Sequence, residues 1–201
     1  MPKLMLIDGN SLTYRAFHAL PTDLATASGQ VTNAVYGFTA MLLNLVRDHQ
    51  PDLIGVTFDR PEPTFRHKRY PQYKATRQET PEDLISQLEP LKEIVRAFRV
   101  PLIELPGYEA DDVLATLAKK AEKEGYEVRI LTADRDLYQL VSDRVAVLHP
   151  EGHLITPEWL WEKYGLRPEQ WVDFRALVGD PSDNLPGVKG IGEKTALKLL
   201  K

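Results

Sequence analysis

The distribution of apolar positions along the chain predicts alternating strands and helices. Short apolar runs are typical of buried strands, and they occupy residues 3–7, 53–58, 100–105, 127–131 and 144–148. Apolar residues at helical spacing predict intervening helices over residues 34–46, 81–98 and 109–124. This alternation predicts an α/β fold with a mostly parallel central sheet and helices on both faces.

Three of the predicted strands are followed closely by an aspartate, at Asp8, Asp59 and Asp134. A single acid at a strand end most often forms a turn. Ligands of open parallel sheets, however, bind outside the carboxyl ends of the strands. We therefore expect these three carboxylates to meet at one edge of the sheet.

The pattern changes after about residue 150. Short helices are predicted over 157–164 and 168–178, followed by a loop rich in Gly, Pro and Asp and by a helix from Glu193. We expect an α/β domain over residues 1–150 and a helical appendage over residues 151–201. The sequence stops within the last predicted helix without a cap, which suggests a truncated C-terminus.

Composition narrows the class of protein. The absence of cysteine excludes disulfides, thiolate metal sites and cysteine nucleophiles. There is no apolar run long enough to span a bilayer and no signal peptide, so we expect a cytoplasmic protein without a membrane partner. The net charge of −4 disfavours a protein that coats nucleic acid through overall positive charge.

Acidic residues gather in a few segments of the chain. Besides the three strand-end aspartates, they are Glu109, Asp111, Asp112, Asp136, Asp180 and Asp183. An acid-rich helix N-terminus is the simpler interpretation of Glu109 to Asp112 alone. Nine carboxylates at one edge, however, would require cations, and Mg²⁺ or Mn²⁺ prefers such oxygen ligands. The sequence predicts a hydrolase with two such ions, whereas zinc is disfavoured because no HExxH-type motif is present.

A basic segment follows Asp59. Residues 59–77 contain six Lys or Arg and two acids, interleaved with aromatic residues. An exposed charged loop is the simpler interpretation, but basic and aromatic residues together are typical of contacts with single-stranded nucleic acid. Because the segment begins at a strand-end acid, we expect it to attract a phosphodiester chain to the metal site.

The loop GVKGIGEK, residues 187–194, joins two predicted helices. Its glycines Gly187, Gly190 and Gly192 would let the backbone approach a ligand closely, and a helix N-terminus with Lys194 favours phosphate. A glycine-rich helix cap is the alternative. The segment is a candidate duplex clamp that holds phosphates without reading sequence.

Together these motifs resemble the 5′ nuclease domain of bacterial DNA polymerase I, in the flap endonuclease superfamily. The resemblance covers residues 3–201 and rests on LIDGNSLTYRAFHAL, FDRPEPTFRH, YKATR, GYEADDVLATLA, LTADRDLYQL and GDPSDNLPGVKGIGEKTA. It implies that residues 1–150 form a metal-dependent nuclease domain of the PIN-like 5′ nuclease fold, with a helical arch over about residues 65–98. It also implies a helix–three-turn–helix segment near the C-terminus.

The resemblance further implies 5′→3′ exonuclease and 5′ flap endonuclease activity, for primer and flap removal in replication and repair. All nine acids match the family's metal ligands, with Asp111 and Asp134 counted as catalytic together with Lys74 and Arg77. The implied DNA contacts are Arg66, Tyr73, Lys74, Arg77, Gly187, Lys189, Gly190, Gly192 and Lys194.

The implied cofactors are two Mg²⁺ or Mn²⁺ ions, and a K⁺ ion at the helix–three-turn–helix loop. The implied partners are DNA with a 5′ flap, nick or 5′ end, including RNA primers on DNA. The expected form is a monomer in the bacterial nucleoid, forming part of a longer polymerase.

Two other functions remain open from the residues alone. A non-catalytic DNA-binding module could share the fold, although no acid of the pattern is missing. A phosphatase-like hydrolase could use Asp8 as a nucleophile, although it would have no need for the basic segment. Without the nine acids the rest of the chain is net positive, so we expect divalent ions to strengthen DNA binding.

Overall fold

The computed structural model describes residues 1–201, and its elements are arranged around a central sheet. Its six strands follow the order β3-β2-β1-β4-β5-β6. The strands are β1 (Lys3–Asp8), β2 (Leu53–Thr57), β3 (Leu102–Ile103), β4 (Glu127–Leu131), β5 (Val145–Leu148) and β6 (Leu154–Ile155). All neighbours are parallel except β5 and β6. The predicted, mostly parallel sheet is therefore confirmed.

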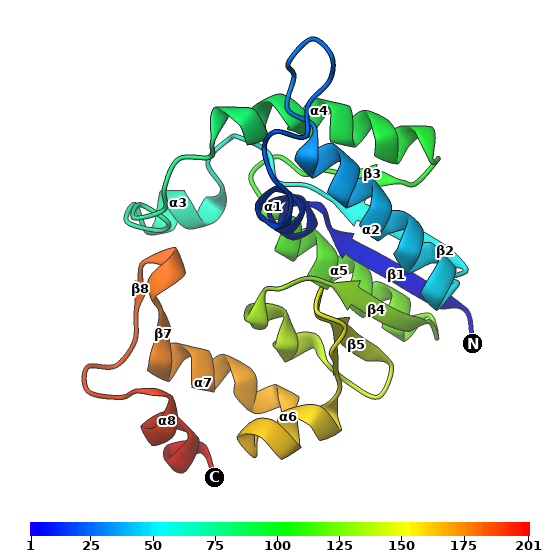
Figure 1. Ribbon diagram of the computed structural model, residues 1–201. Coiled ribbons are helices and arrows are strands. Elements are labelled where there is room, and N and C mark those ends of the chain that lie inside the picture. The colour runs from blue at the N-terminus through cyan, green and yellow to red at the C-terminus, as the bar shows by residue number, and fades with distance from the viewer.

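Helices cover both faces of this sheet, as predicted (Figure 1). One face carries α1 (Gly9–Ala19), α2 (Asn33–His49) and α4 (Glu82–Ala97), and the other carries α5 (Ala110–Lys123), α6 (Pro157–Tyr164) and α7 (Trp171–Val178). Side chains alternate along a strand, so Met5 and Ile7 of β1 pack in the first layer and Leu6 in the second.

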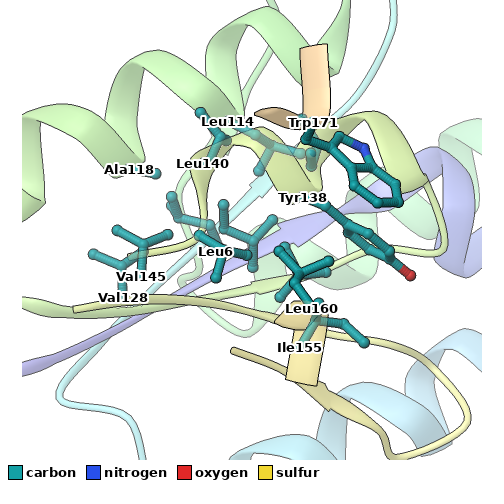
Figure 2. Packing of buried hydrophobic residues seen from close by; sticks show 14 of the residues in the cluster. Leu6, Leu114, Ala118, Val128, Tyr138, Leu140, Val145, Ile155, Leu160 and Trp171 are labelled. Carbon is teal, nitrogen blue, oxygen red and sulfur yellow. The ribbon is translucent and has the colours of Figure 1, made fainter. Parts of the chain in front are cut away.

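The second layer includes residues from the C-terminal segment. Figure 2 shows Trp171 of α7 in one cluster with Leu6 and Leu114. The indole N–H of Trp171 also donates to the carbonyl of Arg135, at 2.7 Å. The boundary predicted near residue 150 is therefore not a break in packing, because the C-terminal helices complete the core of the sheet domain.

Helix α1 is an element that the sequence did not predict. The segment Asp8-Gly9-Asn10 suggested a turn, but the helix begins directly after β1. Asp8 caps it by accepting the backbone N–H of Ser11 at 2.9 Å. Glycine is required at position 9 because the chain there passes close to β2. A Cβ at Gly9 would lie 2.6 Å from the carbonyl oxygen of Thr57.

The predicted arch contains two different kinds of structure. Helix α3 (Phe65–Arg69) lies outside the sheet. The following residues 70–77 also lie outside it, and we call residues 70–77 the strap. Helix α4, in contrast, buries Leu84, Leu91 and Val95 in the first layer. The apolar face of α4 therefore belongs to the body of the domain, and the extent of the arch over about residues 65–98 stays a prediction.

The C-terminal end carries small elements not predicted from the sequence. A two-stranded hairpin of β7 (Gly179–Asp180) and β8 (Leu185–Pro186) encloses the single turn η3 (Pro181–Asp183). The last helix is α8 (Glu193–Leu200). In Figure 1 the hairpin faces α3 and the strap. No helix has the length and apolarity needed to cross a bilayer.

Candidate functional site

A cleft of about 1630 Å³ lies at the carboxyl edge of the sheet. Of the acids predicted as metal ligands, it is lined by Asp8, Asp59, Asp111, Asp134 and Asp180. The basic residues Lys74, Arg77 and Arg175 line it as well. The convergence expected for strand-end aspartates is therefore present, since all three of them reach this one cleft.

Four of the acids have no basic side chain in contact, and we call Asp8, Asp59, Asp111 and Asp134 the unpaired acids. Asp8 is 6% exposed, and burial, with repulsion from Asp59 and Asp134, raises its pKa to about 6. Burial and the charges of Asp8 and Asp134 raise the pKa of Asp111 well above its ordinary value. The pKa of Asp134 is raised as well, mainly by burial. Ionising these groups together requires added positive charge.

Hydrogen bonds fix the orientation of three unpaired acids. Asp8 accepts the hydroxyl of Thr132 at 2.8 Å, and Asp59 accepts the backbone N–H of Ala110 at 2.7 Å. Asp134 accepts the backbone N–H of Asp136 at 2.7 Å. By contrast, Oδ1 of Asp111 is buried with no hydrogen-bond partner. A buried carboxylate oxygen without a partner is a candidate ligand atom.

The other five acids each contact a basic side chain, and we call them the paired acids. The pairs are Glu109 with Lys74 (2.8 Å), Asp112 with Arg66 (2.6 Å), Asp183 with Arg77 (2.5 Å), Asp136 with Arg175 (2.5 Å) and Asp180 with Arg175 (2.6 Å). Burial raises the pKa of Asp112, but hydrogen bonds from Arg66 and from the backbone N–H of Glu109 outweigh it and hold this pKa low.

No three acidic or histidine side chains are arranged as ligands of a single metal ion in this structure. The paired acids explain part of this result, because their oxygens face guanidinium or ammonium groups. The unpaired acids nevertheless suit a hard divalent cation, since they offer only oxygen donors and include the unsatisfied Oδ1 of Asp111. The assignment of all nine acids as metal ligands stays a prediction.

The strap is attached to the turn η3 across the cleft. The backbone N–H of Lys74 donates to the carbonyl of Asp183 at 3.0 Å. The hydroxyl of Tyr73 lies 2.9 Å from Oε2 of Glu109 and 3.0 Å from Oδ2 of Asp183. Nε of Arg77 donates to the carbonyl of Ser182 at 3.3 Å. The contacts with Ser182 and Asp183 connect segments that are more than one hundred residues apart in sequence.

Two of the predicted single-strand contacts are engaged within the protein. Tyr73, expected to stack on a base, is only 6% exposed and contacts acids through its hydroxyl. Arg66 forms a two-point pair with Asp112, at 2.6 and 2.8 Å. Either residue can meet DNA only after these contacts change. Their DNA-binding roles therefore stay predictions.

The glycine loop contains two kinds of glycine. A Cβ at Gly187 would lie 2.3 Å from the carbonyl oxygen of Val178, so this position is required for packing. Gly190, at φ +83°, and Gly192, which caps α8, have nothing within 4 Å of a Cβ. Lys189 and Lys194 are exposed. Gly187 and most of the rest of the loop are exposed, but only Gly190 and Gly192 leave space for an added Cβ, and we call these two the open part of the loop.

Two residues of the site were not predicted from the sequence. Arg175 joins Asp136 to Asp180, and its only sequence signal is a basic residue in the apolar segment that precedes the acidic loop. Thr132 donates to Asp8 and accepts the backbone N–H of Asp134 at 3.0 Å. A hydroxyl residue at a strand end is too common to have indicated this role.

Comparison with known families assigns the class of protein. Residues 3–165 match the family described as 5′-3′ exonuclease, N-terminal resolvase-like domain. Residues 166–201 match the 5′-3′ exonuclease, C-terminal SAM fold. The chain therefore belongs to the 5′-3′ exonuclease family, as the sequence motifs suggested.

Its curated relatives are bacterial DNA polymerases I. The chain is 69% identical to the thermostable DNA polymerase I of Thermus thermophilus (strain ATCC 27634) and 63% identical to that of Thermus aquaticus, each over 199 residues. It is 55% identical to DNA polymerase I of Mycobacterium tuberculosis over 205 residues. These alignments cover 99% of this chain but only about a quarter of each relative.

Solved structures share the fold. A crystal structure of the bacteriophage T5 D15 flap endonuclease, a variant in a pseudo-enzyme-product complex with DNA and metal ions, matches with a TM-score of 0.82 at 24% identity. The match covers 98% of this chain and 74% of that one. The catalytic core of Rad2 in complex with DNA substrate matches with a TM-score of 0.61 at 19% identity, covering 98% and 60%. The predicted 5′ nuclease fold is confirmed.

Proposed function

We propose that this chain hydrolyses phosphodiester bonds at 5′ ends and 5′ flaps of DNA, including RNA primers on DNA, with two Mg²⁺ or Mn²⁺ ions. The observation that carries the proposal is the group of unpaired acids, which meet in one cleft that Lys74 and Arg77 also line. Membership of the 5′-3′ exonuclease family and the high identity to DNA polymerases I support the same function.

The unpaired acids would hold the first divalent ion, and Asp136, Asp180 and Asp183 would contribute to the second. When bound, such ions supply Lewis acidity that activates water and stabilises the leaving oxygen. The hydroxyl of Thr132 donates to the carboxylate of Asp8 and accepts the backbone N–H of Asp134, so it orients the side chain of Asp8 and fixes the backbone at Asp134. This fixed orientation limits the reorganisation needed on binding.

The basic residues of the strap would position the scissile phosphate. Lys74 lies in the cleft with its ammonium on Glu109, and Arg77 lies beside Asp183. A phosphate that enters between strap and acids can accept hydrogen bonds from both side chains. Their positive charge would then stabilise the negative charge that develops on the phosphate during hydrolysis.

Duplex DNA would bind at the open part of the glycine loop. Lys189 and Lys194 are exposed, and the backbone N–H groups at the start of α8 point away from the helix. The proposal includes a K⁺ ion bound at this loop. The proposed form is a monomer within a longer polymerase. It would act in the nucleoid, in replication and repair.

A gel assay on a duplex with a labelled 5′ flap tests the activity. We expect cleavage near the flap junction with Mg²⁺ or Mn²⁺ and none with a chelator. Binding of the flap duplex without cleavage, in the presence of either ion, would instead support a non-catalytic DNA-binding module. Hydrolysis of a phosphate monoester without flap cleavage would support a phosphatase.

A further inference from the structure

Arg175 joins two of the paired acids. Its Nε donates to Oδ1 of Asp136 at 2.5 Å and its Nη2 donates to Oδ2 of Asp180 at 2.6 Å. The side chains of Arg175 and Asp180 are 19% and 16% exposed. The guanidinium therefore lies between two carboxylates, of which Asp180 is largely shielded and Asp136, at 39% exposed, is reached by water.

The two acids reach Arg175 from different parts of the fold. Asp136 belongs to the 3₁₀ helix η1 (Arg135–Leu140) that follows β4, whereas Asp180 follows α7. Helix α7 is fixed because Trp171 and Phe174 are fully buried in the core. The position of Arg175 is therefore set by core packing rather than by a flexible surface.

The unpaired acids differ from this group in the charge of their contacts. None of Asp8, Asp111 and Asp134 forms an ion pair, although the charge of Lys74 acts on Asp111 and that of Arg175 acts on Asp134 from a greater distance. Asp136 and Asp180 already share one full positive charge, held by two short hydrogen bonds. A divalent ion that approaches Asp136 and Asp180 must displace or tolerate a directly paired guanidinium, whereas one that approaches the unpaired acids has no ion-paired cation to displace.

We infer that the guanidinium of Arg175 competes with a divalent metal ion for Asp136 and Asp180. The inference rests on the proposed metal-dependent function. Divalent ions bind in two classes, a tight class at the unpaired acids and a weak class at Asp136 and Asp180. Arg175 is thus a positioning residue that sets the affinity of the weak class and keeps its two acids together before the ion arrives.

Calorimetric titration of the chelator-treated and dialysed chain with Mn²⁺ tests this role. In Arg175→Gln the competing charge is lost, so we expect the Kd of the weak class to fall at least tenfold while the tight class changes less than threefold. Arg175→Lys keeps the charge and should leave the weak class within threefold of the wild-type value. The exposed pair of Arg47 with Asp48 provides a control, and Arg47→Gln should change neither class.

A second variant keeps the inference testable if Arg175→Gln does not fold. Asp136→Asn should abolish the weak class and leave the tight class intact. A weak class that is unchanged in Arg175→Gln, or that survives in Asp136→Asn, would overturn the role of Arg175. Failure of the proposed function has a different signature, because the wild-type chain would then show no saturable Mn²⁺ binding and no flap cleavage.

Discussion

Nζ of Lys74 lies 2.8 Å from Oε1 of Glu109, so the proposed phosphate contact is held by an acid of the site. The side chain of Glu109 is 8% exposed and that of Lys74 is 17% exposed. The pair is therefore largely shielded from solvent, and removing one partner would leave the other charge poorly solvated. A phosphate that binds in the cleft must take over the ammonium from Glu109.

The first prediction concerns this ammonium. Lys74→Ala removes the charge that would stabilise the reacting phosphate, so we expect the single-turnover cleavage rate to fall by roughly 10²–10³-fold. Affinity for the flap duplex should fall much less, because Arg77 and the glycine loop remain. Fluorescence anisotropy would measure binding and a labelled flap would measure cleavage. Lys119→Ala on the surface of α5 is the control, and an equal loss there would contradict the assignment.

The second prediction concerns Asp134. Asp134→Asn keeps an oxygen that can accept the backbone N–H of Asp136, but it removes one negative charge from the unpaired acids. We expect cleavage to be lost, flap binding to survive, and the rise in Tm caused by Mn²⁺ to shrink. Asp143→Asn, at an exposed position, should behave as the wild-type protein. Normal turnover in Asp134→Asn would exclude the proposed site.

The third prediction concerns pH. The pKa of Asp8 rises from 3.8 to about 6 on folding, so the folded state holds this proton more tightly than the unfolded state. The free energy of unfolding in chelator should therefore lose about 3 kcal/mol from Asp8 as pH rises from about 4 to about 6. Asp8→Asn keeps the cap of α1 but cannot titrate, so its stability should exceed that of the wild-type protein increasingly over this range. Denaturant titrations at each pH would measure this difference, and parallel profiles would refute it.

The fourth prediction concerns the anchor of the strap. Tyr73→Phe removes the hydroxyl that lies between Glu109 and Asp183, which should weaken the attachment of the strap by about 1–3 kcal/mol. Trypsin should then cut after Lys74 and Arg77 faster than in the wild-type protein. Tyr70→Phe is a matched control, because the hydroxyl of Tyr70 makes only contacts of 3.4 and 3.5 Å. Equal digestion rates in both variants would show that the hydroxyl of Tyr73 does not hold the strap.

The fifth prediction separates packing from binding in the glycine loop. Gly187→Ala places a Cβ against the carbonyl of Val178, so it should cost about 1–3 kcal/mol of stability. Gly192→Ala meets nothing within 4 Å and should leave Tm unchanged while it weakens duplex binding. Thermal melting and anisotropy on the same two variants would measure both effects. A Gly187→Ala protein with unchanged Tm and weakened duplex binding would contradict the packing role of Gly187.

The sheet and its acidic edge were predictable because they depend on local patterns. Apolar runs identify β1, β2 and β4, and the rules for parallel sheets place their carboxyl ends together. Helix α1 was missed because Asp-Gly-Asn is typical of a turn, and only the close approach of Gly9 to β2 shows why a helix begins there. Helix α4 was predicted as a helix, but its packing in the first layer depends on contacts with α2 and the sheet that the local pattern does not contain.

The division of the acids into paired and unpaired groups was not predictable from spacing. It depends on which basic side chain reaches which acid, and Arg77 and Asp183 are 106 residues apart. For Tyr73 the pattern of basic and aromatic residues suggested an exposed ring. Its burial follows from two acids that approach from other segments. Such distant contacts are fixed by the whole fold rather than by a local motif.

The origin of the acids along the chain has a consequence for the cell. Asp8 comes from the first strand, whereas Asp183 comes from a turn near the C-terminal end of this sequence. A chain still emerging from the ribosome holds the early acids without the late ones or the C-terminal core that supports them. The cleft therefore cannot be assembled on an early nascent chain, and its full set of acids meets only when synthesis of this region is nearly complete.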